Sequence, residues 1–191
     1  ETVKEKGFYI LPSSLFANVR QRARNDANLN ETLSRIFAEI EGSANGEGLR
    51  VCIVSARWNS FVTEKLTEGA VATLKECGLR DDDVTVARVP GAFEVPTAAA
   101  WAARSGRFDA VICIGAVIRG ETAHFEYVAG GATDGIGDVS RDTGVPVIFG
   151  VLTVDSVQQA LDRAGGKEGH KGEEAVRVVI EMANLRKFFE F

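Results

Sequence analysis

From Leu49 onward, short apolar runs alternate with longer segments whose apolar residues recur at helical spacing. Apolar runs of this length and composition are typical of buried parallel strands. Strands that alternate with helices through short connections predict an α/β fold, here a three-layer sandwich with a four-stranded parallel sheet flanked by helices. The expected strands are residues 49–54, 84–89, 110–114 and 146–152, and the expected helices are residues 61–77, 95–103, 125–142, 156–164 and 172–189.

The third expected strand leads into the segment Gly115–Val128, which we interpret as beginning with a loop that carries His124. Right-handed crossovers place the carboxyl ends of all four strands at one edge of the sheet, where open α/β folds bind ligands. Three other strand ends run into glycine and polar or aromatic residues, at Ser55–Asn59, Arg88–Glu94 and Ile148–Val151. We therefore expect these segments to meet His124 at one site, although a lone histidine beside aromatic residues is more often structural.

A second cluster of charge surrounds the glycine-rich link 165–172, which precedes the last expected helix. Arg163 lies before this link, and Lys167 and Lys171 lie within it. Backbone N–H groups at a helix start, with a guanidinium and an ammonium nearby, can bind a phosphate or another oxyanion. The alternative is that these residues are solvated charges that cap a helix.

Two aromatic residues and one carboxylate suggest a small-molecule site near the same edge. Trp58 and Phe149 are each expected to follow a strand, where a flat heterocycle would stack on them, although aromatics at such positions more often belong to the core. Glu94 follows a Pro90–Gly91 turn and would accept hydrogen bonds from sugar-like hydroxyls; its alternative role is a charge at a helix N-terminus.

Charge and cysteine content narrow the class of protein. The net charge of −5 argues against a nucleic-acid-binding surface, which is normally basic. Cys52, Cys77 and Cys113 are widely spaced, so we interpret them as small buried residues in a reducing compartment rather than as zinc ligands. No metal site, cofactor, nucleic acid or membrane partner is expected, and neither a membrane span nor a signal peptide is evident. The expected location is the cytoplasm.

Residues 1–48 differ in character from the rest and predict a separate helical extension that ends in a linker. Helix-start signals and apolar spacing predict two short amphipathic helices, and the glycine-rich stretch 42–48 has linker composition. Residues 12–41 fit the pattern PSxLFxNVxxxAxxxxxLNxxLxxxFxxIE, so residues 1–44 resemble a segment of type I restriction-modification methyltransferase subunits. No catalytic motif accompanies this resemblance, and we expect residues 49–191 to form the main domain.

Residues 49–191 as a whole resemble the 6,7-dimethyl-8-ribityllumazine synthases, which catalyse the penultimate step of riboflavin biosynthesis. The resemblance implies condensation of 5-amino-6-(D-ribitylamino)uracil with 3,4-dihydroxy-2-butanone 4-phosphate, without a cofactor. It also implies a homopentamer with active sites between neighbouring subunits. The motifs that carry it are SARWN at 55–59, VPGAFEVP at 89–96, IGAVIRGETAHFEYV at 114–128, PVIFGVLT at 146–153, RAGGKEGHKGEEA at 163–175 and IEMANL at 180–185.

The resemblance also implies roles for individual residues on the pyrimidine side of the site. His124 would shuttle protons, because an imidazole can both accept and return a proton near neutral pH. Trp58, where the family usually has phenylalanine, would stack on the ring, with Asn59 beside it in the same motif. Two sets of contacts remain. The ring and the ribityl chain would be contacted by Ala92, Phe93 and Glu94. The pyrimidine would also be contacted through the backbone groups of Ala116, Val117 and Ile118.

On the phosphate side, the backbone N–H groups of Glu121 and Thr122 would face the butanone phosphate. A neighbouring subunit would contribute Phe149 to close the pocket, Arg163 to hold the phosphate bidentately and Lys171 to add charge. The family's usual GTKxGNKG differs here, because Gly166 replaces a threonine and His170 replaces an asparagine.

Two other functions compete with the enzyme. The chain would serve mainly as an assembly module, or it would hold a flavin or lumazine without turnover. The motifs leave the oligomer size open between a pentamer, a decamer and an icosahedral 60-subunit shell.

Overall fold

The computed structural model describes residues 4–5, 8–9 and 40–189, and the chain divides into two compact units, residues 1–40 and 41–191. In the first unit, the described residues form one antiparallel pair, β1 (Lys4–Glu5) with β2 (Phe8–Tyr9). The two amphipathic helices predicted before residue 40 lie outside the described residues. The boundary predicted at residue 48 stays a prediction.

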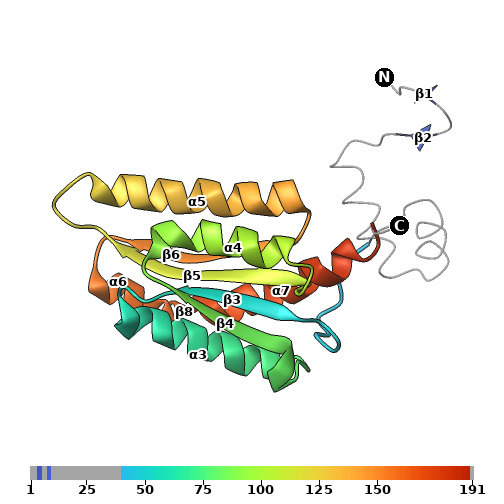
Figure 1. The fold of residues 1–191 in the computed structure, drawn as a ribbon, viewed down its shortest axis with the longest axis horizontal. Helices are drawn as coiled ribbons and strands as arrows, with labels where there is room; N and C mark the ends of the chain where they lie inside the picture. Colours follow the sequence, from blue (N-terminus) through green and yellow to red (C-terminus); the bar gives the residue numbers. More distant parts are fainter. Residues whose placement is uncertain (1–3, 6–7, 10–39, 190–191) are drawn as a thin grey trace. The chain divides into compact units, whose positions relative to one another are not determined.

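The second unit is a four-stranded parallel sheet with helices on both faces, so the predicted fold class is confirmed (Figure 1). The strand order is β4-β3-β5-β6. The strands are β3 (Val51–Ala56), β4 (Val84–Val89), β5 (Ala110–Ile118) and β6 (Val147–Val154). The helices are α3 (Ser60–Glu76), α4 (Val95–Arg104), α5 (His124–Thr143), α6 (Val157–Asp162) and α7 (Lys171–Arg186), with single 3₁₀ turns η1 (Asp81–Asp83) and η2 (Ala92–Glu94).

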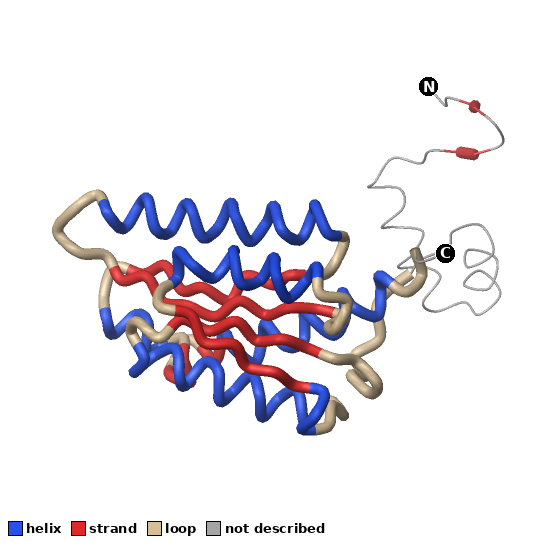
Figure 2. The backbone as a smooth tube through the Cα atoms, in the orientation of Figure 1, coloured by secondary structure: helices blue, strands red, loops and turns tan. Residues whose placement is uncertain are grey.

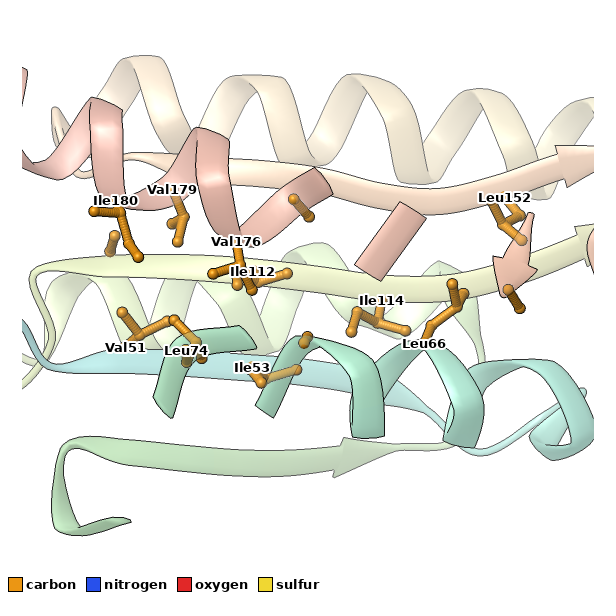
Figure 3. Close-up of a cluster of buried hydrophobic side chains, with 14 of the residues drawn as sticks. Val51, Ile53, Leu66, Leu74, Ile112, Ile114, Leu152, Val176, Val179 and Ile180 are labelled. Carbon is orange, nitrogen blue, oxygen red and sulfur yellow. The ribbon is translucent and has the colours of Figure 1, made fainter. Parts of the chain in front are cut away.

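Alternation along the strands divides the core into two layers, which the tube view separates as helices above and below the sheet (Figure 2). Val51, Ile53 and Ile112 point toward α3 and α7, where they pack with leucine, valine and isoleucine side chains (Figure 3). Cys52 and Val54 point the other way, toward α4 and α5. Complete burial of each large aliphatic side chain stabilises the fold by roughly 1.5–3 kcal/mol.

The helix α5 forms despite its four internal glycines, as predicted for residues 125–142. A Cβ at Gly131 would lie 2.6 Å from the Phe93 ring, and one at Gly135 would lie 2.8 Å from Pro96. These glycines therefore let η2 and α4 approach α5 closely. The packing gained there offsets the ~1 kcal/mol that each glycine costs relative to alanine in a helix.

Three predicted boundaries are wrong in ways that affect the site. The strand β5 continues to Ile118, four residues beyond its predicted end, because it stays paired with β6 up to Val154. The helix α6 ends at Asp162, and an unpredicted hairpin follows it, formed by β7 (Ala164–Gly166) and β8 (Gly169–His170). The last helix, predicted for residues 172–189, spans Lys171–Arg186 instead.

Candidate active site

A pocket with a volume of about 210 Å³, which we call the His124 pocket, opens at the carboxyl ends of β3 and β5. It lies where ligands bind in open α/β sheets. It brings together most of the residues predicted for the pyrimidine side. Its lining residues are Trp58, Asn59, Ala92, Ala116, Val117, Ile118, Gly120, Thr122, His124, Phe125 and Val128.

Asn59 joins the two strand ends that frame this pocket. It is the N-cap residue of α3 and has a left-handed backbone with φ of 58°, a region that asparagine tolerates better than most residues. Its side-chain Nδ2 donates a hydrogen bond to the carbonyl oxygen of Ala116 at 2.8 Å. The preceding residue, Trp58, donates its backbone N–H to Pro90 at 3.0 Å, and its side chain stays 65% exposed. The indole is therefore held at the mouth of the pocket on a fixed backbone.

His124 is the first residue of α5, not part of a loop as predicted. Its backbone N–H donates to the hydroxyl of Thr122 at 3.4 Å. Because β5 extends to Ile118, the connection that precedes the helix is only residues 119–123. The imidazole and the backbone of β5 consequently line the same cavity.

Arg119 anchors this short connection, and the sequence analysis missed it. Its guanidinium pairs with the Glu126 carboxylate, donates to Asp155 at 2.8 Å and lies 4.1 Å from the centre of the Phe125 ring. The hydrogen bond from Arg119 holds the pKa of Glu126 below its usual value. The only hint in the sequence was that Arg119 and Glu126 flank His124. Asp155 is too distant in the sequence for any spacing rule to predict its contact with Arg119.

Phe93 and Glu94 lie beside the His124 pocket without lining it. The Phe93 ring covers Gly131 of α5 and is 57% exposed. One carboxylate oxygen of Glu94 accepts the backbone N–H of Gly91 at 2.9 Å, at the start of η2. This contact matches the alternative role considered for Glu94 at a helix N-terminus, and it leaves the second oxygen for other donors. Glu121, an exposed residue of the connection to α5, lines neither pocket described here.

A separate and larger pocket, which we call the Arg163 pocket, lies along β6 and the start of α7 and has a volume of about 420 Å³. Phe149 belongs to this pocket. The prediction that Phe149 follows a strand beside Trp58 is wrong, because the residue lies inside β6 opposite Cys113, well before the carboxyl end of that strand. The lining is Arg163, Lys171, Glu174, Ala175, Val178 and residues 148–154.

Two cations face the Arg163 pocket, and the β7–β8 hairpin brings them together. The backbone N–H of Lys171 donates to the carbonyl of Arg163 at 2.9 Å. The Lys171 ammonium contacts both oxygens of Glu174, at 2.7 and 2.9 Å, and the guanidinium of Arg163 donates to the carbonyl of Gln159 at 3.1 Å. Lys167 does not line this pocket and pairs with Asp162 at 3.4 Å.

The two pockets share no lining residue. One offers an indole, an imidazole and backbone groups, and the other offers a phenyl ring, two cations and the Glu174 carboxylate that pairs with one of them. Neither contains all of the groups predicted for the site.

The described residues provide no cluster of side chains suited to a metal ion. Burial raises the pKa of the Cys52 thiol to about 11 and raises the pKa of Cys113 as well, so both stay protonated near neutral pH. Among the helices in the described ranges, none has the length and hydropathy needed to cross a membrane.

An open parallel sheet with a largely apolar pocket at its carboxyl edge, lined also by an imidazole, defines an α/β protein with a site for a small molecule. The family model for 6,7-dimethyl-8-ribityllumazine synthase matches residues 48–187, and the chain belongs to that family of transferases. The family predicted from the sequence motifs is thereby confirmed. The family acts in riboflavin biosynthesis.

Proposed function

We propose that this chain condenses 5-amino-6-(D-ribitylamino)uracil with 3,4-dihydroxy-2-butanone 4-phosphate to give 6,7-dimethyl-8-ribityllumazine, phosphate and water. Membership of the family supports the proposal. The observation that carries it is the division of the site residues between two pockets, one suited to a flat ring and one suited to an anion. We assign the activity to residues 49–191 and treat residues 1–48 as an extension.

The division of residues supports a site assembled from two copies of the chain. In this arrangement, the His124 pocket of one subunit faces the Arg163 pocket of its neighbour, as in a ring with head-to-tail interfaces. Large apolar side chains exposed outside both pockets favour such self-association, because exposed apolar surface marks interaction sites. They include Phe61, Trp101, Tyr127 and Met182. We propose a pentamer as the smallest active assembly.

On the pyrimidine side, the Trp58 indole stacks on the heterocycle while Ala92 and the backbone of residues 116–118 contact its polar edge. Asn59 acts through its bond to Ala116, which fixes the carbonyl and the strand end beside it. Phe93 and the free carboxylate oxygen of Glu94 face the ribityl chain, whose hydroxyls are donors that a carboxylate accepts.

On the phosphate side, Arg163 binds two phosphate oxygens and Lys171 adds a point charge, while Phe149 closes the pocket over the butanone carbons. Glu121 and Thr122 of the first subunit offer backbone N–H groups just before α5. The N-terminus of that helix adds favourable electrostatic potential for the dianion.

The reaction then requires proton transfers and close positioning, with no covalent enzyme intermediate and no cofactor. The amine of the pyrimidine attacks the ketone carbon, and loss of water gives an imine. A proton leaves the adjacent carbon, phosphate departs by elimination, and ring closure releases a second water molecule. His124 accepts and returns protons during these steps. Most of the rate enhancement comes from holding both substrates in reactive geometry.

Subunit mixing tests the shared site. His124→Ala and Arg163→Ala, carrying different tags, are co-expressed, and assemblies containing both are isolated through the two tags. The assay keeps the phosphate substrate below its wild-type KM, where both variants alone have little activity. With random mixing around a ring, intact His124 and Arg163 meet at about a quarter of the interfaces, so about a quarter of wild-type activity returns. If the mixed assemblies are no more active than the two variants purified separately, the shared site is wrong.

A further inference from the structure

His170 lies between the two cations of the Arg163 pocket along the backbone. It occupies β8, where it pairs with Ala164, the residue that follows Arg163. It is also the N-cap residue of α7 and directly precedes Lys171. Any displacement of His170 therefore moves the backbone of both cationic residues.

Both ring nitrogens of His170 are occupied by backbone groups. Nδ1 lies 3.3 Å from the backbone N–H of Glu173, and Nε2 lies 3.2 Å from the carbonyl oxygen of Lys65. A backbone N–H only donates and a carbonyl only accepts. One tautomer of the neutral imidazole satisfies both contacts, with Nδ1 as the acceptor and the proton on Nε2.

Three glycines leave room for this ring. A Cβ at Gly69, in α3, would overlap the Cε1 and Nε2 atoms of His170. A Cβ at Gly172 would overlap the Leu66 carbonyl oxygen of α3 and would lie 3.1 Å from Cε1 of the ring, and one at Gly165 would lie 3.4 Å from Cδ2. The imidazole is thus packed between α3, the hairpin and α7, and it hydrogen-bonds to two of these elements.

We propose that His170 is a positioning residue for the phosphate of the butanone substrate. It contacts no substrate and acts through the backbone of Arg163 and Lys171. Its bond to Glu173 fixes the first turn of α7, and its bond to Lys65 ties that turn to α3, so the guanidinium and the ammonium keep a constant spacing. This inference rests on the proposed function. Holding Arg163 and Lys171 in place matters only if the phosphate of the substrate binds to them.

The test uses the full chain and inorganic phosphate as the probe, measured by calorimetry and as a competitive inhibitor. His170→Phe keeps a flat ring but offers no acceptor to Glu173. It should weaken phosphate binding and raise KM for the phosphate substrate about fivefold, the effect of losing an N-cap bond. Both kcat and KM for the pyrimidine should stay near wild type. His170→Asn restores a side-chain acceptor at the N-cap and should recover most of the loss.

Two further variants separate positioning from general destabilisation. Gly69→Ala, which leaves His170 in the sequence but displaces its ring, should reproduce the effect of His170→Phe on phosphate. Ser105→Ala removes a hydroxyl that accepts a backbone N–H just after α4, away from both pockets, and should leave phosphate binding unchanged. The melting temperature of each variant is measured in parallel.

The possible failures are distinct. If Arg163→Ala weakens phosphate binding but His170→Phe does not, the positioning role is wrong while the proposed function stands. The same conclusion follows if His170→Phe changes both substrates equally, or if His170→Asn gives no recovery. If the wild-type assembly binds no phosphate, both proposals fail.

Discussion

The His124 pocket and the Arg163 pocket are built by different means. The first is formed by strand ends and a helix start, and its polar groups are largely backbone atoms held by Asn59 and Arg119. The second lies along the edge strand β6, and its polar groups are charged side chains engaged by Glu174 and Gln159. A site made of backbone and rings recognises shape, whereas a site made of cations recognises charge.

This difference predicts that changes in the two pockets will affect different kinetic constants. Groups that act on reacting atoms should alter kcat, and groups that hold a remote anion should alter KM for the substrate that carries it.

The largest effect is expected from His124→Ala. Loss of the proton-transfer group should lower kcat by ~10²- to 10⁴-fold while KM for each substrate changes little. Steady-state kinetics with both substrates measure this. Thr133→Ala is the control on the same helix, because that hydroxyl donates to the Ala129 carbonyl of its own helix and the residue lines neither pocket. A kcat for His124→Ala within the error of the wild-type value would show that His124 has no catalytic role.

Arg163→Ala should act mainly on binding. Loss of charge-assisted hydrogen bonds to phosphate should raise KM for the phosphate substrate ~10- to 100-fold, with a much smaller change in kcat. Arg163→Lys keeps the charge without the planar fork and should give an intermediate value. If KM for the phosphate substrate is unchanged in Arg163→Ala, or if KM for the pyrimidine rises instead, the Arg163 pocket does not bind the phosphate substrate as proposed.

A pair of adjacent glycines in α5 tests the wall beside the His124 pocket. Gly131→Ala places a Cβ against the Phe93 ring, so it should displace that side chain and raise KM for the pyrimidine severalfold. A Cβ at Gly130 meets nothing within 4 Å. Gly130→Ala should therefore leave KM unchanged and stabilise the fold by ~0.5–1 kcal/mol through helix propensity. Denaturant unfolding and kinetics on both variants measure the difference, and equal effects of the two would contradict this account of Phe93.

The smallest effect concerns acid stability, where each pocket has one neighbouring carboxylate with a lowered pKa. The pKa of Glu126 is lowered mainly by the hydrogen bond from Arg119. The pKa of Asp162 is lowered mainly by the hydrogen bond from Gln158. Since the folded pKa is below the unfolded value in both cases, the stabilisation is present above about pH 4.5 for Glu126 and above about pH 3.8 for Asp162, and each is lost as the pH falls through its folded pKa.

Melting temperatures between pH 7 and pH 3 should show this loss as a decline that begins below about pH 4.5. Arg119→Met should weaken the decline that Glu126 causes, and Gln158→Ala should weaken the part due to Asp162. A decline of unchanged steepness in both variants would show that neither carboxylate contributes.

Local patterns were sufficient for the layers of the fold, and they pointed to some of the residues that line each pocket. The alternation of apolar runs with helical periodicity predicted the parallel sheet, because burial of a strand between two helical layers requires apolar residues on both faces. The glycine-rich helix α5 was predicted from the same periodicity, although its glycines are explained only by Phe93 and Pro96 packing against them.

The errors at Gly115, Phe149 and Arg119 occurred where a distant partner decides the structure. The third strand was predicted to end at Ile114, before Gly115, but this glycine lies inside β5 and allows close packing against Ala92 and Val151, whose side chains lie 3.3 Å from the position of a Cβ there. Phe149 was placed at a strand end, but pairing with β5 puts it inside β6. Arg119 was overlooked because one of its partners, Asp155, is 36 residues away.

The amino-acid sequence alone therefore determined the α/β class and the family, because these depend on residue types at short spacings. It also supplied the residues that we propose bind the substrates and transfer protons. The tertiary structure decided how these groups are divided. It places Trp58 and His124 around one cavity and Phe149, Arg163 and Lys171 around another, because strand pairing and helix packing join residues that no local pattern connects.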